Sequence, residues 1–273
     1  SVRDLAAIEG DVAGIDAGDI VRMATTIENT GGGNAFDVVT SITLPTGISF
    51  VGGSLAAANL QIYRGDGTQL ILGTDYTVSG NTIEFLDANG QGTLLAGRTG
   101  TTADTSGSNL VVITYDTVVS QGIEASRTLQ STGTLTHYAS VEGGADFTPT
   151  DLTDTAGQQV AAPSVTKNYA GGALDDGDSS ASHTTGSDLV IGESMLYDIV
   201  VTLPEGVTPS LVLTDLIPAG LRLDMSFNNG AGYMLMPGGL NGNVAVSDMD
   251  AASGALGGDG AGPRLTFSIP QAD

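Results

Sequence analysis

Apolar and polar residues alternate along most of this chain in segments that are too short for typical helices. Residues 19–28 and 36–44 each mix apolar side chains with threonine and charged residues, and the Gly-rich segment 29–34 separates them. Alternation with a period near two predicts a strand with one buried face, and glycine supplies the backbone freedom that a turn needs. The two segments therefore predict a strand, a turn and a return strand.

Further strands follow the same pattern. Residues 60–63, 76–78 and 81–86 alternate and predict a meander. Residues 110–115 are apolar almost without interruption, which predicts a strand in the middle of a sheet covered on both faces. Residues 87–109 are rich in Gly, Thr, Asp and Ser and predict a long surface connection. Other strands are predicted at residues 1–15, as an edge strand, and at 129–142, 158–161, 163–170 and 265–269.

The first strand pair recurs later in the chain. The offset between matched positions is 174 residues in the first half of the segment and 173 in the second. A repeat this long predicts two copies of one β-sheet domain. The matched pairs are Gly18-Asp19 with Gly192-Glu193, Met23 with Tyr197, Ile27 with Val201, Pro45 with Pro218 and Gly47 with Gly220.

The repeat divides the chain into residues 1–162 and 163–273. The first copy carries long inserted loops. The last predicted strand, residues 265–269, aligns with residues 82–86, so counterparts of the strands near 110 and 129 are missing from the second copy. We therefore expect the second β-sandwich to be incomplete in this chain, completed either by further sequence or by a strand from a neighbouring subunit.

Charge excludes several classes of partner. The 273 residues include 31 Asp and Glu against 8 Lys and Arg, a formal net charge of −23. Such a surface repels nucleic acid and anionic membranes and attracts cations. We expect no nucleic-acid partner and no membrane insertion. A saline or calcium-containing exterior suits the unpaired carboxylates.

The chain has no Cys and no Trp, but it has 40 Gly. Disulfides and thiol chemistry are thereby excluded. No signal peptide and no apolar run of about 20 residues is visible. The expected context is a mature or excised part of a longer protein.

Short motifs in both copies carry a resemblance to a known family. They are residues 18–21, 27–31 and 44–48 in the first copy, and 165–167, 192–193, 197–201 and 214–221 in the second. With these motifs the chain resembles a family of bacterial conserved repeat domains of unknown function, found in tandem in large cell-surface and secreted proteins. The resemblance implies an immunoglobulin-like fold, an extracellular location on the bacterial cell surface, and no enzyme activity. The expected fold class is therefore all-β, with two immunoglobulin-like β-sandwich modules in tandem.

Acidic loops are the candidate metal sites. Calcium takes six to eight oxygen ligands, and flexible Asp/Gly segments can supply them. The first candidate loop precedes the repeated strand pair and holds Asp175, Asp176, Asp178 and Asp188; a second holds Asp248, Asp250 and Asp259. A solvated acidic loop is the alternative. Residues 87–92 look like half of a calcium loop but lack its terminal acidic ligand, which favours a plain turn. No cofactor is required, and Ca²⁺ is the expected ion if one binds.

Lys167 is the only lysine of the chain and lies in a predicted first strand. Related surface domains place there a lysine that forms an isopeptide bond with an asparagine, catalysed by a buried acid. The resemblance thus makes Lys167 a candidate isopeptide lysine, provided that burial allows its neutral amine to attack. An exposed strand lysine is the alternative.

No catalytic motif is present. His137 and His183 are the only histidines and fall in different copies, which disfavours a histidine metal site or a triad. Arg64-Gly65-Asp66 has the form of an integrin-binding tripeptide, but a turn explains it. We expect a structural component of an extracellular surface array, stalk or filament, whose partners are other copies of the protein or neighbouring surface modules. The alternative is an adhesin module that binds carbohydrate or a partner protein.

Overall fold

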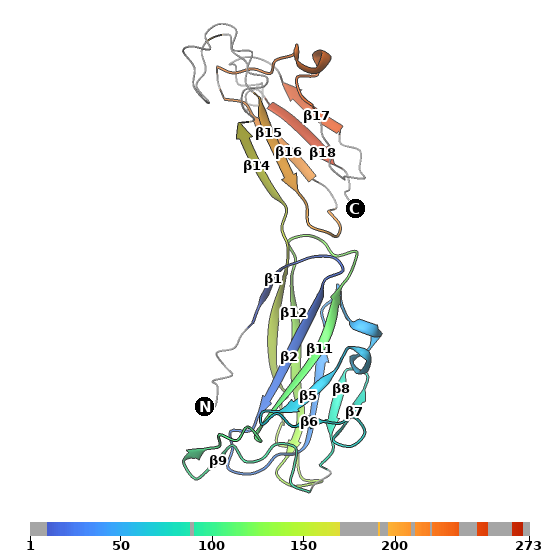
Figure 1. Cartoon of the computed structure of the whole chain (residues 1–273), viewed down its shortest axis with the longest axis vertical. Coiled ribbons are helices and arrows are strands. Elements are labelled where there is room, and N and C mark those ends of the chain that lie inside the picture. Colours follow the sequence, from blue (N-terminus) through green and yellow to red (C-terminus); the bar gives the residue numbers. More distant parts are fainter. Residues whose placement is uncertain are drawn as a thin grey trace. The chain divides into compact units, whose positions relative to one another are not determined.

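The chain divides into two compact units, Ser1–Ala161 and Ala162–Asp273, called unit 1 and unit 2 below. Both are built from strands (Figure 1). In the part of the chain that is described, no helix is long and apolar enough to span a membrane. The computed structural model describes residues 10–87, 90–169, 191, 196–208, 211–218, 220–234, 245–250 and 264–269.

Unit 1 is a sandwich of two sheets. The first sheet has the order β1-β13-β12-β3-β8-β7, and the second has β2-β11-β5-β6 with β4 also pairing with β11. The first comprises β1 (Val12–Ile15), β13 (Leu152–Val160), β12 (Thr128–Ala139), β3 (Phe36–Thr43), β8 (Thr82–Phe85) and β7 (Tyr76–Ser79). The second comprises β2 (Ile20–Glu28), β11 (Leu110–Val119), β5 (Gln61–Arg64), β6 (Gln69–Leu70) and β4 (Ile48–Phe50).

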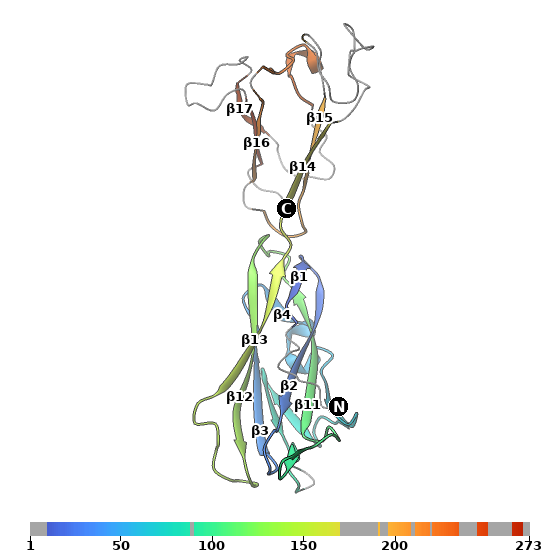
Figure 2. The ribbon, with the colours of Figure 1, turned by 90° about the vertical axis from the view of Figure 1, so that its left-hand side faces the viewer.

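The strand order within the layers is immunoglobulin-like. One layer holds β2, β11 and β5 as neighbours, and the other holds β13, β12 and β3, which is the Greek-key arrangement of such sandwiches. Figure 2 shows β12, β13 and β3 on one side of unit 1 and β2 with β11 on the other. The predicted all-β, immunoglobulin-like fold class is confirmed.

The expected strand pair at the start of the repeat is not a hairpin, and that prediction is wrong. β2 lies in the five-stranded sheet and β3 in the six-stranded sheet, so the turn between them carries the chain from one layer to the other. Each strand needs an apolar face in either arrangement, so alternation alone cannot tell a hairpin from a crossing between sheets. Within the turn, the Asn29 side chain donates hydrogen bonds to the carbonyls of Gly33 and Leu95, both at 2.8 Å.

The predicted meander is also only partly correct. β7 and β8 form the expected hairpin. β5, however, pairs with β6 and β11 in the opposite sheet. The predicted edge strand is present as β1, which pairs in parallel with β13 at the edge of the six-stranded sheet.

β11 lies at the centre of its sheet, as its sequence predicts, between β2 on one side and β5 and β4 on the other. Only one of its faces is buried, however, because every second residue is only half-buried. No second layer of described residues covers its outward face, so the apolar run overstated its burial. The inward residues Val111, Ile113 and Tyr115 are at most 2 % exposed.

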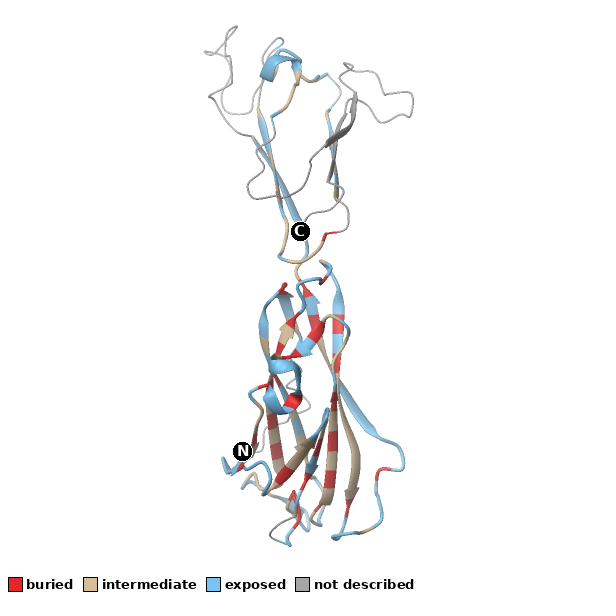
Figure 3. Ribbon diagram, turned by 90° about the vertical axis from the view of Figure 1, so that its right-hand side faces the viewer, coloured by how far each residue is buried: buried red, intermediate tan, exposed pale blue. Residues whose placement is uncertain are grey.

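The main core lies between the two sheets. Ile42, Ile62, Ile83 and Ile113 are fully buried there, and Phe50 packs edge-on against Tyr115 with ring centroids 5.8 Å apart. A second cluster, which includes Ile15, Val119 and Val160, fills one end of unit 1. Figure 3 shows buried positions alternating with half-buried ones along the strands.

The connections of unit 1 carry little regular structure. A two-stranded ribbon of β9 (Arg98–Thr99) and β10 (Thr102–Ala103) lies within the predicted surface connection. Leu94 anchors the same connection to the core at 2 % exposure. Two short 3-10 helices, η2 (Val51–Gly53) and η3 (Leu55–Ala57), follow β4, and the second buries Leu55.

Unit 2 repeats the crossing between sheets. β15 (Tyr197–Thr202) pairs with β14 (Ser164–Tyr169) in one sheet, whereas β16 (Leu211–Leu216) lies in another with β18 (Arg264–Ile269) and β17 (Ala245–Asp250). By sequence, β15 is the counterpart of β2 and β16 of β3. A short 3-10 helix, η4 (Phe227–Gly230), follows β16. Among the residues described in unit 2, no strand occupies the places of β11 or β12.

Candidate functional site

The predicted calcium loop cannot be compared with the structure. Asp175, Asp176, Asp178, Asp188 and Asp259 lie outside the described residues. Asp248 and Asp250 fall in β17, for which only the backbone is described. This candidate metal site stays a prediction.

The structure brings together a different acidic cluster in unit 1. Asp37 is the second residue of β3, Asp87 follows β8, and Glu142 follows β12. One carboxylate oxygen of each lies within 4.8 Å of the others. We call these three residues the acidic cluster.

Backbone amides hold the two aspartates of the acidic cluster. The amide of Asp37 donates to Oδ2 of Asp87 at 2.7 Å, and the amide of Gly143 donates to Oδ2 of Asp37 at 2.8 Å. The hydroxyl of Thr93 donates to Oδ1 of Asp87 at 2.8 Å. Asp37 has a φ of 52°, a left-handed conformation that few non-glycine residues adopt.

The surroundings of the acidic cluster raise the pKa of the Glu142 carboxyl. Partial loss of solvent raises the pKa of its carboxyl, and the negative charges of Asp37 and Asp87 raise that pKa further. Carboxylates are hard oxygen ligands, and a divalent cation would relieve this repulsion. Three carboxylates are fewer ligands than calcium requires, so water or carbonyl oxygens would have to complete its shell.

Only one member of the acidic cluster is marked in the sequence. Asp87 opens the segment that looked like half of a calcium loop. Asp37 and Glu142 lie about fifty residues to either side of it along the chain, in segments that showed no acidic pattern. Only the pairing of β3 with both β8 and β12 places the three together.

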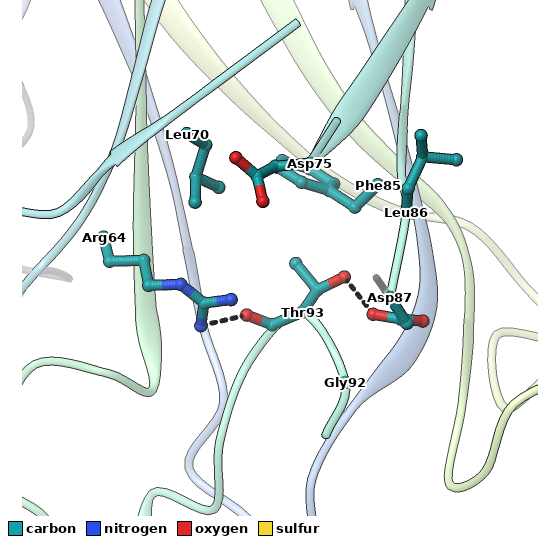
Figure 4. Close-up of a pocket in the computed structure, with 8 residues that line it drawn as sticks. All are labelled: Arg64, Leu70, Asp75, Phe85, Leu86, Asp87, Gly92 and Thr93. Carbon is teal, nitrogen blue, oxygen red and sulfur yellow. Dashed lines mark hydrogen bonds between the residues drawn. The ribbon is translucent and has the colours of Figure 1, made fainter. Parts of the chain in front are cut away.

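A shallow pocket adjoins the acidic cluster and shares Asp87 with it (Figure 4). On one side, Nη1 of Arg64 donates to the carbonyl of Thr93 at 2.6 Å. Arg64 and Asp87 thus both bind Thr93, which fixes the loop that forms the pocket wall. The pocket is open to solvent and is lined by Arg64, Leu70, Asp75, Phe85, Leu86, Asp87, Gly92 and Thr93.

The same contacts explain the Arg64-Gly65-Asp66 tripeptide. Arg64 is bound to Thr93, and Oδ1 of Asp66 accepts the amide of Thr68 at 2.8 Å. A Cβ on Gly65 would lie 2.8 Å from the carbonyl oxygen of Gly107, so a side chain is excluded. The tripeptide is a turn that the fold requires.

Lys167, the candidate isopeptide lysine, reaches an acid on the opposite sheet of unit 2. Its Nζ lies 2.6 Å from Oδ1 of Asp215 on β16. The same Nζ lies 4.7 Å from the ring centroid of Tyr197. The Lys167 and Asp215 side chains are 36 % and 20 % exposed, and the isopeptide role of Lys167 stays a prediction.

The repeat shows where this ion pair lies. At the offset of 173 residues, Asp215 is the counterpart of Ile42, which is fully buried in unit 1. Asp215 therefore occupies an inward position of β16, facing the sheet that carries Lys167. The sequence singled out Lys167 but gave no signal for Asp215, because the pairing depends on two sheets that face each other.

His137 lies beside an aspartate in unit 1. Its Nδ1 lies 3.4 Å from Oδ1 of Asp146, beside the strand β12. The Asp146 carboxylate is also held by the hydroxyl and amide of Thr148, which lower its pKa. His183 lies outside the described residues.

The fold and these sites define an immunoglobulin-like sandwich module with a loop-end acidic cluster and an ion pair between sheets. No family model and no curated protein matches the chain, so membership in the predicted family of repeat domains stays a prediction. Solved structures do show likenesses, with TM-scores below 0.5.

Three of these solved structures are pilins of Gram-positive bacteria. The pilus backbone RrgB of Streptococcus pneumoniae is 19 % identical over 47 % of this chain and 44 % of its own, with a TM-score of 0.35. The C-terminal fragment of the major pilin GBS80 of Streptococcus agalactiae is 12 % identical over 76 % of this chain and 80 % of its own, at 0.38. The major pilin BcpA of Bacillus cereus is 9 % identical over 58 % and 39 %, at 0.39. The chain spans less than half the length of RrgB and BcpA.

Proposed function

We propose that the protein is a structural component of an extracellular bacterial surface array, stalk or filament. The observation that carries this proposal is the repeated crossing of β2–β3 and β15–β16 between sheets, because tandem sandwich modules act as spacers. The acidic surface, with a net charge of −23, keeps such a chain soluble outside the cell. A filament subunit is also what the pilin structures named above represent.

The proposal extends to how copies associate. In the described residues, β15 and β16 lack the neighbours that β11 and β12 provide in unit 1. Tyr197 is 41 % exposed, whereas its counterpart Met23 is 8 % exposed. A strand supplied by another copy would cover this face and pair with the free edges by β-augmentation.

Hydrogen exchange at several protein concentrations tests this assembly. If copies donate strands, the amides of β15 and β16 gain protection as concentration rises, in step with an increase in mass by light scattering. The amides of β11 serve as the internal control, because they are paired within unit 1 at every concentration. A monomer with fully protected β15 and β16 at the lowest concentration would contradict strand donation.

The isopeptide role of Lys167 belongs to the same proposal. It is supported by the 2.6 Å contact with Asp215, an acid in reach of the amine. Attack on an asparagine side chain would release one ammonia, so intact-mass spectrometry of the native chain measures it directly. Lys167→Arg is the control, because it keeps the charge but cannot form the bond. An equal loss of mass in the wild-type and Lys167→Arg chains, or no loss in either chain, would contradict the isopeptide role.

Calcium binding is tested with variants of the two acidic sites. We expect calcium to raise the melting temperature and chelator to reverse the rise. Loss of the effect in Asp175→Asn with Asp176→Asn assigns it to the predicted loop. Loss in Asp87→Asn assigns it to the acidic cluster instead and contradicts the predicted loop. If calcium does not change the melting temperature of the wild-type chain, calcium binding at both sites is contradicted.

A second candidate function is that of an adhesin module. The observation that favours it is the outer face of the six-stranded sheet of unit 1, where hydroxyl side chains from five strands share one row: Thr153, Thr134, Ser41, Thr82 and Ser79.

A further inference from the structure

The first part of β13 has a neighbouring strand on one side only. β12 pairs with β13 from Leu152 to Gln159, whereas β1 pairs with it only from Gln158 onward. Among the described residues, no strand therefore lies beside the backbone of residues 152–156 on the side away from β12. We call these five residues of β13 the free edge.

Backbone groups of Thr153 and Thr155 point outward from the free edge. The Gly157 amide donates to Oδ1 of Asp11 at 2.7 Å, and Asp11 directly precedes β1, on the side away from β12. In an antiparallel pair, alternate residues bond the neighbouring strand and those between them point away from it. The Thr155 amide accordingly donates to Oδ1 of Asp154 at 2.9 Å. The free edge thus presents the N–H and C=O groups of Thr153 and Thr155 to an incoming strand.

The other side chains of the free edge face the opposite sheet. Leu152, Asp154 and Ala156 alternate in step with Gln158, which is 1 % exposed. Ala156 packs against the main core, but Leu152 is 58 % exposed and Asp154 is exposed as well. The residue opposite Asp154 on β12 is Gly133, which has no side chain to cover the carboxylate. The free edge therefore offers an apolar side chain beside an uncovered carboxylate.

A sheet edge of this kind recognises extended polypeptide. Its rows of N–H and C=O groups match the backbone of another strand, which supplies affinity, and alternate side chains supply specificity. Proline and lysine commonly protect such edges, and residues 152–156 contain neither. Their one protective feature is Asp154, because a strand that buries this carboxylate without a partner pays for its desolvation.

The charge of Asp154 selects the strand that can bind. An added strand places one side chain beside Asp154, and Lys or Arg at that position compensates the carboxylate where other residues do not. β1, β12 and β13 contain no Lys or Arg, and none of the ion pairs among the described residues includes Asp154. Asp151, directly before β13, adds a second exposed negative charge. The free edge is therefore complementary to a basic segment.

A second copy of this chain is a poor occupant of the free edge. Its net charge is −23, so two copies repel each other. Three of its basic strand residues, Arg22, Arg64 and Lys167, are already bound within their own units. A basic segment of another protein meets neither obstacle.

We propose that the free edge of β13 binds an extended basic segment of a partner protein by strand addition. The segment carries Lys or Arg beside Asp154 and an apolar residue two positions away, beside Leu152. On binding, the Thr155 amide passes from Oδ1 of Asp154 to a carbonyl of the segment, which releases the carboxylate for the incoming cation. This inference rests on the second candidate function, the adhesin module, and gives it a partner class and a site.

Two peptides that differ in one charge test the inference on the full chain. The first is Thr-Val-Thr-Lys-Thr-Val-Thr, blocked at both ends, in which Lys has a Val two positions away in either direction. In the second, Glu replaces Lys. In NMR titrations we expect the Lys peptide to shift the amide signals of residues 152–156 most and to bind about fivefold more tightly than the Glu peptide. High salt should reduce this preference.

Two variants separate the charge from the backbone. Asp154→Lys reverses the charge at the free edge and should reverse the preference, so that the Glu peptide binds more tightly. Thr153→Pro removes an outward N–H group without removing a bond to β12, and should weaken binding of the Lys peptide about fivefold or more.

Thr26→Pro is the matched control on the other sheet, where β2 is an edge strand. The Asn29 amide donates to the carbonyl of Asn109, which directly precedes β11, so the amide of Thr26, three residues earlier, points away from β11. This variant should bind the Lys peptide as the wild type does. Melting curves ensure that only folded chains are compared.

Several results would overturn the inference. Equal binding of the two peptides would do so, as would equal loss in Thr153→Pro and Thr26→Pro. Slow hydrogen exchange at the amides of Thr153 and Thr155 without peptide would mean that the chain itself covers the free edge. If Asp154→Lys abolishes self-association measured by ultracentrifugation, the occupant is a second copy and the inference is wrong.

The outcome is separable from that of the structural proposal. Strand donation is read from the amides of β15 and β16 in unit 2, and peptide binding from those of β13 in unit 1. Peptide binding with no concentration-dependent protection supports the adhesin role alone. Protection without peptide binding supports the structural role alone and overturns the inference.

Discussion

The two units show what the same repeated segment becomes in different surroundings. In unit 1, β2 and β3 face each other across a core closed by β11 and β12, and Val38 and Ile42 are at most 1 % exposed. In unit 2, the counterparts on β15 and β16 are half-buried or exposed. The repeated segment therefore supplies one strand to each layer, and the burial of either strand depends on what the later strands contribute.

One inward position carries an apolar residue in unit 1 and a charged residue in unit 2. Ile42 of unit 1 is replaced in unit 2 by Asp215, which pairs with Lys167. A charged pair between layers is tolerated where the side chains keep contact with water, and its net value is small. Closing the sandwich over this pair would remove that water and raise the cost of any mismatch in its geometry.

The largest expected effect is on the core of unit 1. Ile42→Ala deletes buried methyl groups and should lower the free energy of unfolding of unit 1 by about 2–5 kcal/mol. Leu211→Ala, at the counterpart of Val38 in unit 2, should cost clearly less, because Leu211 is only half-buried. Denaturant unfolding with probes in each unit measures both. Equal losses would mean that unit 2 has a closed core in solution.

A glycine in unit 1 provides the next largest effect. A Cβ on Gly97 would overlap the carbonyl oxygen of Asn29, which lies at the start of the turn that crosses between the sheets. Gly97→Ala should destabilise unit 1 by about 1–3 kcal/mol through this overlap. Gly100→Ser is the control in the same connection, because a Cβ on Gly100 meets no other atom within 4 Å. The positive φ of Gly100 adds backbone strain to this variant. Thermal unfolding should show the larger loss for Gly97→Ala.

The ion pair of unit 2 is expected to contribute less. Lys167→Met removes the partner of Asp215, and partly exposed pairs are worth about 0.2–1 kcal/mol. A double-mutant cycle with Asp215→Asn isolates the coupling between the two side chains. A coupling energy above this range would mean that the ion pair is desolvated in solution and that the sandwich of unit 2 is closed over it.

The smallest effect concerns the pH dependence of the acidic cluster. The raised pKa of Glu142 means that its native carboxyl holds its proton more tightly than in the unfolded chain. Its contribution to stability is present below the unfolded pKa and is lost as the pH rises through the folded pKa. Glu142→Gln should therefore be more stable than the wild type at neutral pH, and the difference should vanish in acid. Melting temperatures between pH 3 and 7 measure it, and a difference that does not change with pH would contradict the assignment.

The sequence by itself determined the all-β class, the positions of most strands and the two-copy organisation of the pattern. These follow from alternation, from turn-forming glycines and from a repeat, all of which are local or linear properties of the chain. The sequence also marked Lys167, as the only lysine, and Asp87, as the first residue of a partial calcium-loop motif. The tertiary structure decided which strands are neighbours, since an alternating segment can pair with any edge in register.

Each error or omission has that same origin. The expected hairpin of β2 and β3 is a crossing between layers, and the expected meander gives β5 to the other sheet. The acidic cluster and the Lys167–Asp215 pair each join residues that are distant in sequence. The sequence marks only Asp87 and Lys167, and their partners are known only when the strands are placed. Periodicity predicts that a strand has one apolar and one polar face. Which strands lie beside it, and therefore which side chains share each face, depends on tertiary packing.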